Sequence, residues 1–402
     1  MIKLTQIVIL LFFLISCNDN EIASPIPDDN SMEFISGVDL SSYPEISKVN
    51  PKFYDLNGNE SELLTILKEN GVNTVRLRIW VNPDNEHSSF REVKEFSKTL
   101  QTIGFKTLLT LHYSDSWADP GQQKTPEQWQ GLDISSLKDS VYVYTKKVID
   151  ELNPNFIQIG NEINTGLLHP FGHLTNNYEQ FIELMQSGIA AVRENTNETK
   201  IIIHFAGIEN SEWFFNQVKQ LDYDIIGLSY YPIWHGKSLS NLKNKMQVLS
   251  ETHQKKILIA ETAYPFTLSW NDWTNNIVGL EDQLILPDFP ASNEGQRQFI
   301  KNIKQLIKEL ENGVGFCYWG AELISWKGNQ ASDASPWENQ ALFNFKNEAL
   351  PVLNEFKTDK LKKDFLAERK GFEPSIPFWS IHTFQACAFD HSATSLLQIQ
   401  FN

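Results

Sequence analysis

Short apolar runs rich in β-branched residues alternate with longer amphipathic stretches along most of the chain. The runs that predict strands cover residues 34–40, 74–80, 106–113, 156–163, 200–206, 223–231, 256–262 and 314–319. Between them apolar residues recur at helical spacing, and some helical stretches stop at an Asn-Gly pair such as Asn70-Gly71 or Asn312-Gly313. The pattern predicts eight strand and helix units in series.

The predicted strands are apolar almost continuously, which is typical of parallel strands covered on both faces. Eight such strands with helices between them favour a closed barrel over an open sheet. We therefore predict an α/β fold, a (β/α)8 TIM barrel that forms one domain over residues 34–357. Residues 358–402 show neither helical nor alternating periodicity and are predicted to lie outside this fold.

The N-terminal segment has the pattern of an export signal. An apolar run at residues 7–15 is too short to span a bilayer and ends in Leu14-Ile15-Ser16-Cys17. Residues 1–17 thus predict a signal peptide whose end resembles the lipobox of bacterial lipoproteins, in which Cys17 is lipidated; the alternative is an ordinary signal with a chance cysteine. Residues 18–33, with their prolines and acids, predict a flexible tether. We expect a membrane-anchored lipoprotein of the cell envelope, at the outer membrane, either surface-exposed or periplasmic.

Charge and cysteine content exclude some classes of protein. Lys and Arg number 34 against 50 Asp and Glu, so the net charge of −16 argues against nucleic acid as a partner. The three cysteines, Cys17, Cys317 and Cys387, are too few and too far apart for a disulfide framework or a zinc site. Cys317 stands in an apolar run and is predicted to be a small buried hydrophobic residue.

Polar and aromatic residues gather where the predicted strands end. In a barrel of this kind the chemistry lies at the C-terminal ends of the strands. The sequence shows no GxSxG elbow, phosphate loop or dinucleotide fingerprint that would compete with this set. The strand ends read Arg76–Trp80, His112–Asp115, Gly160–Glu162, Ser229–Pro232, Ala260–Thr262 and Tyr318–Gly320.

Two glutamates stand out among these residues, because Glu162 and Glu261 each end an apolar run, the fourth and the seventh. Two carboxylates that face one cleft suit glycoside hydrolysis, in which one is a protonated acid and the other an ionised nucleophile. The structural alternative is that each glutamate caps a helix or pairs with an arginine. The occurrence of both, beside Asn161 and among aromatic residues, favours the glycosidase.

Six motifs in order along the chain carry a family resemblance. They are Gly37-Val38-Asp39, GVNTVRLRIWVNP at 71–83, HYSDSWADP at 112–120, GNEI at 160–163, GLL at 166–168 and NQALF at 339–343. With them the sequence resembles glycoside hydrolase family 53, the arabinogalactan endo-β-1,4-galactanases, in a bacterial lipoprotein form. The resemblance implies an endo-acting enzyme that cleaves β-1,4-galactosidic bonds of pectic arabinogalactan with retention.

The resemblance also implies roles for the residues at the centre of the site. Glu162 matches the general acid/base and Glu261 the nucleophile. Arg76 is the cation expected to hold the nucleophile ionised. Asn161 would bond the sugar 2-hydroxyl, and Tyr231 would orient the nucleophile.

Further residues match the substrate-binding part of the family's cleft. Trp319 would form the apolar floor beneath the distorted sugar, and His112, Asp115 and Trp117 would supply bonds and a stacking face. His112 and Trp117 have a structural alternative as packed residues at the barrel mouth. Additional stacking candidates are Trp80, Trp234, Trp326 and Trp337.

Cofactors and partners follow from the same resemblance. No cofactor is required and no metal ligands are predicted. Some bacterial members carry a calcium loop after strand seven, but residues 270–276 hold few carboxylates here, so structural calcium is only an alternative. The partners are a polysaccharide and, through Cys17, a membrane; the protein is expected to be a monomer. Two other functions stay open: a barrel glycosidase that cuts mannan or cellulose, and a surface glycan-binding lipoprotein that has lost the chemistry.

Overall fold

The structure, a computed structural model, describes residues 32–357. The predicted signal peptide, Cys17, nearly all of the tether and the tail at 358–402 lie outside the described residues, so the expectations for them stay predictions. None of the helices within 32–357 combines the length and the apolar character that crossing a membrane requires.

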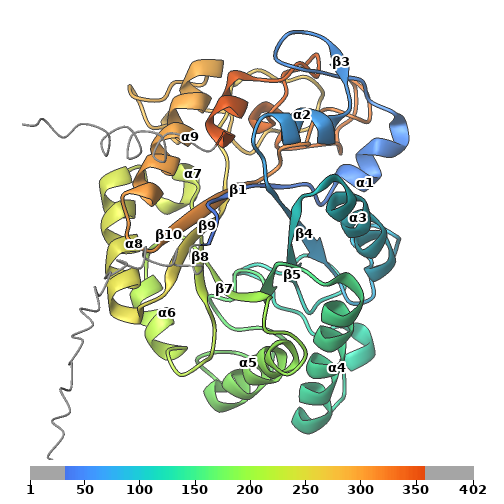
Figure 1. Cartoon of the computed structure of the whole chain (residues 1–402), viewed down its shortest axis with the longest axis vertical. Coiled ribbons are helices and arrows are strands. Elements are labelled where there is room, and N and C mark those ends of the chain that lie inside the picture. The colour runs from blue at the N-terminus through green and yellow to red at the C-terminus, as the bar shows by residue number, and fades with distance from the viewer. Residues whose placement is uncertain (1–31, 358–402) are drawn as a thin grey trace, which may run out of the picture. The chain divides into compact units, whose positions relative to one another are not determined.

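Eight parallel strands close into a barrel, which Figure 1 shows in a view down its axis. They hydrogen-bond in the order β1-β10-β9-β8-β7-β6-β5-β4, with β4 back against β1. The predicted TIM barrel is confirmed. The barrel strands are β1 (Ile35–Asp39), β4 (Thr74–Ile79), β5 (Lys106–Leu111), β6 (Phe156–Ile159), β7 (Lys200–Ala206), β8 (Ile225–Ser229), β9 (Lys256–Thr262) and β10 (Gly313–Tyr318).

Helices surround the barrel on the outside (Figure 1). A small antiparallel pair, β2 (Phe53–Tyr54) and β3 (Glu60–Ser61), lies in the first connection. The α-helices are α1 (Tyr43–Ile46), α2 (Leu63–Glu69), α3 (Phe90–Ile103), α4 (Ile134–Leu152), α5 (Tyr178–Arg193), α6 (Ser211–Gln217), α7 (Pro232–His235), α8 (Leu239–His253) and α9 (Asn293–Lys308).

The eighth unit differs from the prediction, because no α-helix lies between β10 and Lys357, where the described chain ends. A 3-10 helix, Pro351–Phe356, takes that place and packs on α9. Phe356 completes the packing, with its ring 5.3 Å from that of Phe316.

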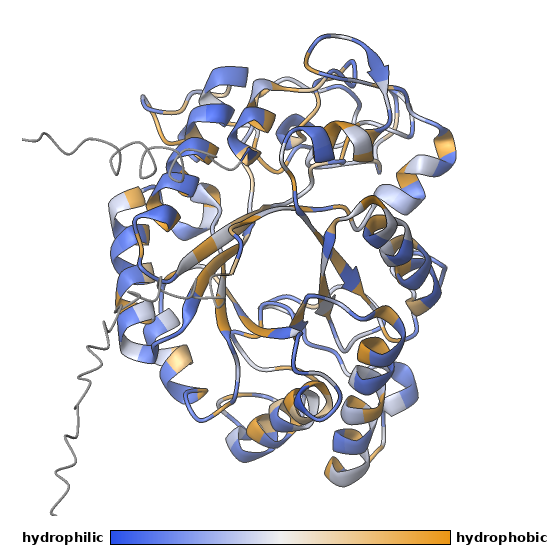
Figure 2. Ribbon diagram, in the orientation of Figure 1, coloured by the Kyte–Doolittle hydropathy of each residue, from blue (hydrophilic) through white to orange (hydrophobic). Residues whose placement is uncertain are grey.

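Two apolar layers hold the barrel together. The larger lies between strands and helices, and Figure 2 shows orange residues along the strands and a mixture of orange and blue on the helices. The smaller takes all its fully buried members from barrel strands, which places it inside the ring; among them are Ile35, Leu108, Phe156 and Leu258. Cys317 belongs to this inner layer and is completely buried, as predicted.

Three strands end two or more residues earlier than the apolar runs predicted: β5 at Leu111, β6 at Ile159 and β8 at Ser229. The backbone turns left-handed just beyond two of these ends, with φ of 48° at Tyr113 and 85° at Gly160. An extended strand cannot continue through such residues. The polar residues that follow are thereby released from the sheet and form the loops at one mouth of the barrel.

Candidate active site

A cleft of about 450 Å³ opens at the C-terminal ends of the strands. Both glutamates singled out in the sequence line it, although they come from strands separated by β7 and β8 in the barrel. The other predicted residues that line this cleft are Arg76, His112, Trp117, Asn161, Tyr231 and Trp319, together with two of the further stacking candidates, Trp234 and Trp337.

A left-handed turn after β6 aims Glu162 into the cleft. Gly160 has φ of 85°, and a Cβ atom there would lie 2.4 Å from Cγ2 of Ile163, so only glycine fits. Glu162 itself has φ of 44°, a conformation that costs a non-glycine residue free energy. The turn brings Asn161 and Glu162 onto the same side of the barrel mouth.

An irregular register in β9 aims the second glutamate. Leu258 and Ala260 both belong to the inner layer, so strict alternation would turn Glu261 outward toward the helices. Leu228 pairs with Ile259, but the next residue, Ser229, pairs with Glu261, so β9 holds one extra residue here. A bulge of this kind redirects the side chain that follows it.

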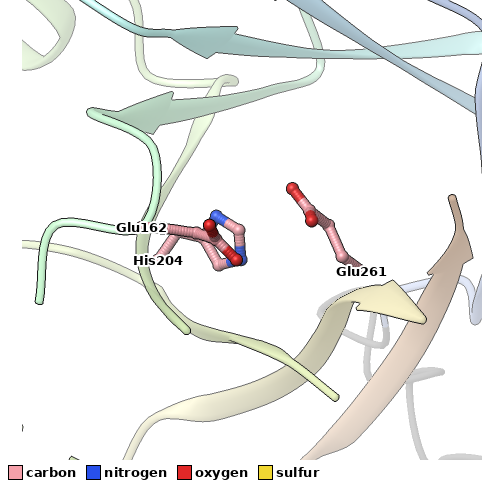
Figure 3. Close-up of side chains that lie close together, drawn as sticks. All are labelled: Glu162, His204 and Glu261. Atoms are coloured by element: carbon pink, nitrogen blue, oxygen red, sulfur yellow. The ribbon is translucent and has the colours of Figure 1, made fainter. Parts of the chain in front are cut away.

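The two carboxylates face one another across the cleft. Figure 3 shows Glu261 at the end of β9 pointing toward Glu162, with His204 beside Glu162. Ligating atoms of these three side chains lie within 4.8 Å of one another. Carboxylates whose oxygen atoms come this close suit direct attack by one of them on the sugar, as in the retaining mechanism, in which no water molecule lies between them.

Arg76 joins the nucleophile candidate to the interior of the barrel. Its guanidinium lies 2.7 Å from both Glu261 Oε1 and Asp39 Oδ2. It also donates to Gln158 Oε1 and Asn161 Oδ1, each at 2.9 Å. Because Arg76 is 1% exposed and bonded on several sides, its position and charge are fixed.

The surroundings of the two carboxylates differ in charge. Burial, and then the neighbouring Glu261, raise the pKa of Glu162 to about 8. Burial also raises the pKa of Glu261, but Arg76 and the Tyr231 hydroxyl, which donates to Oε2 at 3.0 Å, act in the opposite direction. The proton of the pair is therefore held on Glu162, and Glu261 carries the negative charge beside Arg76.

Aromatic and histidine side chains form the rest of the cleft. The indole of Trp117 is 41% exposed and lies 5.9 Å from that of Trp319, measured between ring centroids. His112 Nδ1 accepts from Trp80 Nε1 and from the backbone N–H of Ala118, so the ring proton of neutral His112 is on Nε2. These groups offer a stacking face and a donor to a ligand.

Trp80 and Trp326, the other two stacking candidates, do not line this cleft, and neither does Asp115. Its Oδ1 accepts from the backbone N–H of Asn82 at 2.9 Å, and its Oδ2 from that of Glu127 at 2.7 Å. It lines a separate hollow of about 700 Å³ beside the cleft. Asp115 thus ties two loops together, and its contact with substrate stays a prediction.

Two buried polar residues behind Glu162 received no role from the sequence: His204 was missed, and Ser229 was named only as a strand end. His204 on β7 is completely buried, and its Nε2 lies 2.9 Å from Ser229 Oγ at the end of β8. Ser229 Oγ in turn lies 2.5 Å from Glu162 Oε1. The available signal was a lone histidine within the apolar run Ile201-Ile202-Ile203-His204-Phe205.

The two glutamates also form, with His204, a group that resembles a set of metal ligands. Glu162, His204 and Glu261 are the one group of three potential ligands that comes together within residues 32–357. Glu162 Oε1, both ring nitrogens of His204 and both carboxylate oxygens of Glu261 already have protein partners. The group does not fit a resident metal, because Arg76 already supplies the positive charge.

The loop after β9 at residues 270–276, for which the sequence left structural calcium as an alternative, is held by hydrogen bonds from other protein groups. Asp272 Oδ1 accepts from the backbone N–H of Thr274, and its Oδ2 accepts from the Ser325 hydroxyl at 2.8 Å. Glu338 Oε1 accepts from the backbone N–H groups of Asn271 and Asp272. These bonds clamp the loop to the segment after β10, and whether calcium adds to the clamp stays a prediction.

Two close carboxylates in an open cleft at the C-terminal mouth of a (β/α)8 barrel are the arrangement that glycoside hydrolases use. The model of glycosyl hydrolase family 53 matches residues 35–356, and the chain belongs to this family. The predicted family is confirmed. Glycoside hydrolases of this kind use protein carboxylates and generally need no cofactor.

Known proteins resemble the chain over nearly the whole barrel. It is 34% identical over 346 residues to the arabinogalactan endo-β-1,4-galactanase of Cellvibrio japonicus, covering 81% of this chain and 91% of that protein. Its structure is similar to a family 53 catalytic domain from Ignisphaera aggregans, with 37% identity, a TM-score of 0.76 and coverage of 83% of this chain and 98% of that one. A fungal β-1,4-galactanase structure matches with 28% identity and a TM-score of 0.71, over 81% of this chain and 99% of that chain.

Proposed function

We propose that the protein is an endo-acting, retaining hydrolase of β-1,4-galactosidic bonds in pectic arabinogalactan. The observation that carries the mechanism is the close pair of carboxylates in which only Glu261 is ion-paired, at 2.7 Å from Arg76. The substrate is supported by the names of relatives, since the Cellvibrio japonicus protein is an arabinogalactan endo-β-1,4-galactanase.

In the first step a carboxylate oxygen of Glu261 attacks the anomeric carbon of a galactosyl unit, and the bond to the leaving O4 breaks. Glu162 transfers its proton to that oxygen, and a covalent glycosyl-enzyme forms. In the second step Glu162, now ionised, takes a proton from water, whose oxygen attacks the anomeric carbon. The bond to Glu261 breaks, and both carboxyl groups regain their starting states.

The neighbouring residues prepare this chemistry. Arg76 and Tyr231 fix the orientation of Glu261, so its attacking oxygen needs no rearrangement. The Asn161 amide donates to the Ala118 carbonyl at 2.8 Å with one N–H and has a second N–H for the sugar 2-hydroxyl. Trp319, beneath this site, would receive the apolar face of the sugar.

Incubation with pectic galactan should lower viscosity steeply while few reducing ends have formed. An open cleft holds several sugars, so cuts fall inside the chain and release short β-1,4-galacto-oligosaccharides. Viscosity and reducing ends are followed together, with mannan and cellulose as parallel substrates. Release of galactose alone would contradict internal cutting, and activity confined to mannan or cellulose would establish the alternative specificity.

We further propose that Cys17 carries a lipid that anchors the enzyme to the cell envelope. The support is the sequence Leu14-Ile15-Ser16-Cys17 after an apolar run. Labelled palmitate should be incorporated by the wild-type chain, and Cys17→Ala should abolish labelling and shift the protein out of the membrane fraction. Membrane recovery that is unchanged in Cys17→Ala would contradict the anchor.

A further inference from the structure

A chain of hydrogen-bonding groups runs from Arg76 through the barrel to the acid/base candidate. Asn161 Oδ1 accepts from Arg76 Nη2 at 2.9 Å and lies 3.2 Å from His204 Nδ1. His204 Nε2 lies 2.9 Å from Ser229 Oγ, which lies 2.5 Å from Glu162 Oε1. The three intermediate side chains are at most 5% exposed.

Arg76 determines which partner donates in the first two hydrogen bonds, from Arg76 to Asn161 and from His204 to Asn161. The Asn161 amide nitrogen donates to the Ala118 carbonyl, so its oxygen is the atom that faces Arg76 and His204. Arg76 can only donate, and Asn161 Oδ1 can only accept. His204 Nδ1 must therefore carry a proton to bond this oxygen.

The remaining bonds follow from the proton count. Burial and the nearby positive charge of Arg76 disfavour a charged imidazole, so His204 is neutral and its Nε2 is an acceptor. Ser229 has one hydroxyl proton, and within residues 32–357 its hydroxyl is the group that lies against Nε2, so the proton goes to that bond. With that proton on His204, the lone pairs of Ser229 Oγ face Glu162 Oε1. This is the reverse of Ser229 donating to an ionised Glu162 across the same 2.5 Å contact, and it requires Glu162 to be a protonated carboxylic acid.

We propose that His204, acting through Ser229, holds the catalytic proton on Glu162. The two are positioning residues: neither lines the cleft, and they act by fixing which partner donates. A serine free to turn would donate to the Glu162 carboxylate and favour the ionised form. Because His204 Nε2 accepts the Ser229 hydroxyl proton, that proton is not available to Glu162. Ionisation of Glu162 therefore leaves either His204 Nε2 or the carboxylate without its hydrogen bond.

The same polarity serves both steps of the proposed function, on which this inference rests. In the first step Glu162 starts as the acid that the chain of bonds requires. After the proton has gone to the leaving group, the single hydroxyl proton of Ser229 cannot bond both His204 Nε2 and the ionised Glu162, so one of them lacks a hydrogen bond. Capture of a proton from water restores that bond, which favours Glu162 as the base of the second step.

The pKa of Glu162 measured by ¹³C NMR of labelled glutamate tests the proposal without any substrate. The signal is identified by its absence in Glu162→Gln. The charged or titratable groups that face Glu162 are Glu261, Arg76, Asp119, Tyr231 and His204. Among these groups the variants described below change only His204 and leave the other four in place.

His204→Asn keeps an amide N–H near the position of Nδ1 but removes the acceptor for Ser229. It should lower the pKa of Glu162 by about one unit, the size expected for one hydrogen bond. His204→Gln, whose amide oxygen can reach the place of Nε2, should keep it near the wild-type value. In a Ser229→Ala background, His204→Asn should cause no further shift.

Several results would overturn the proposal. An unchanged pKa in His204→Asn, or an equal shift with and without Ser229, removes the role of the serine. If His204→Asn does not fold, Ser229→Ala alone decides: a rise of one unit or more would show that Ser229 donates to the carboxylate in the wild type.

Activity provides a second readout that separates this inference from the proposed function. The decline of kcat/KM on galactan at high pH should begin at lower pH in His204→Asn, because the acid form of Glu162 is lost earlier. A protein that titrates as expected but does not cleave galactan would contradict the proposed function and leave the inference standing. Cleavage of galactan with unshifted pKa values would do the reverse.

Discussion

Glu261→Gln should lower galactan hydrolysis by about four orders of magnitude or more while oligosaccharide binding changes only a few-fold, because the lost group acts in the reaction rather than in binding. An amide oxygen is a poor nucleophile and cannot leave in the second step. Glutamine keeps the volume of the side chain and an oxygen for the Tyr231 hydroxyl. Reducing-end release measures kcat, and calorimetry with galacto-oligosaccharides measures binding.

A matched control separates chemistry from loss of a buried charge. Glu355 is 8% exposed and pairs with Arg297 at 2.8 Å, away from the cleft. Glu355→Gln should therefore retain activity. A 2-fluoro galactoside inactivator should label wild-type Glu261 and leave Glu261→Gln unlabelled. An α-configured first product, seen by NMR, would show inversion and exclude the nucleophilic role.

Much of the site could be predicted because strand ends in a parallel barrel converge. Glu162, Glu261 and Arg76 follow or lie within apolar runs, and any closed barrel brings such ends to one mouth. The contact between Arg76 and Glu261 could not be predicted in this way. It depends on the extra residue in β9, which no apolar pattern reveals because Ala260 and Leu258 are both compatible with either face.

What the sequence did not reveal about the site depends on loop and hydrogen-bond geometry. Asp115 sits in a motif that resembles the family's, yet its carboxylate caps two backbone N–H groups outside the cleft. His204 lies within a strand where its sequence neighbours are all apolar. Its importance comes from Ser229, 25 residues away in sequence, and such pairs appear only when the register of β7 and β8 is known.

Arg76→Met should lower the free energy of unfolding at neutral pH by about 3–5 kcal/mol, because it leaves Asp39 and Glu261 buried without their cation. Denaturant unfolding measures this loss. Arg91→Met is the control, since the Arg91 side chain is 72% exposed in its pair with Glu86 and such pairs contribute little. Equal losses in the two variants would contradict the special role of the buried ion pair.

The pH dependence of Arg76→Met gives the sign of the electrostatic effect. Arg76 opposes the rise in the pKa of Glu261 that burial causes, so its removal raises that pKa further. A carboxyl group whose pKa is higher in the folded than in the unfolded state destabilises the fold as pH rises. The difference in the free energy of unfolding between the wild type and Arg76→Met should therefore become smaller as pH falls and Glu261 becomes protonated. Because the nucleophile must be ionised, the acidic limb of the activity profile should move to higher pH in Arg76→Met than in the wild type. A parallel loss of stability at every pH, with an unmoved acidic limb, would mean that Arg76 acts through packing alone and that another group holds the charge on Glu261.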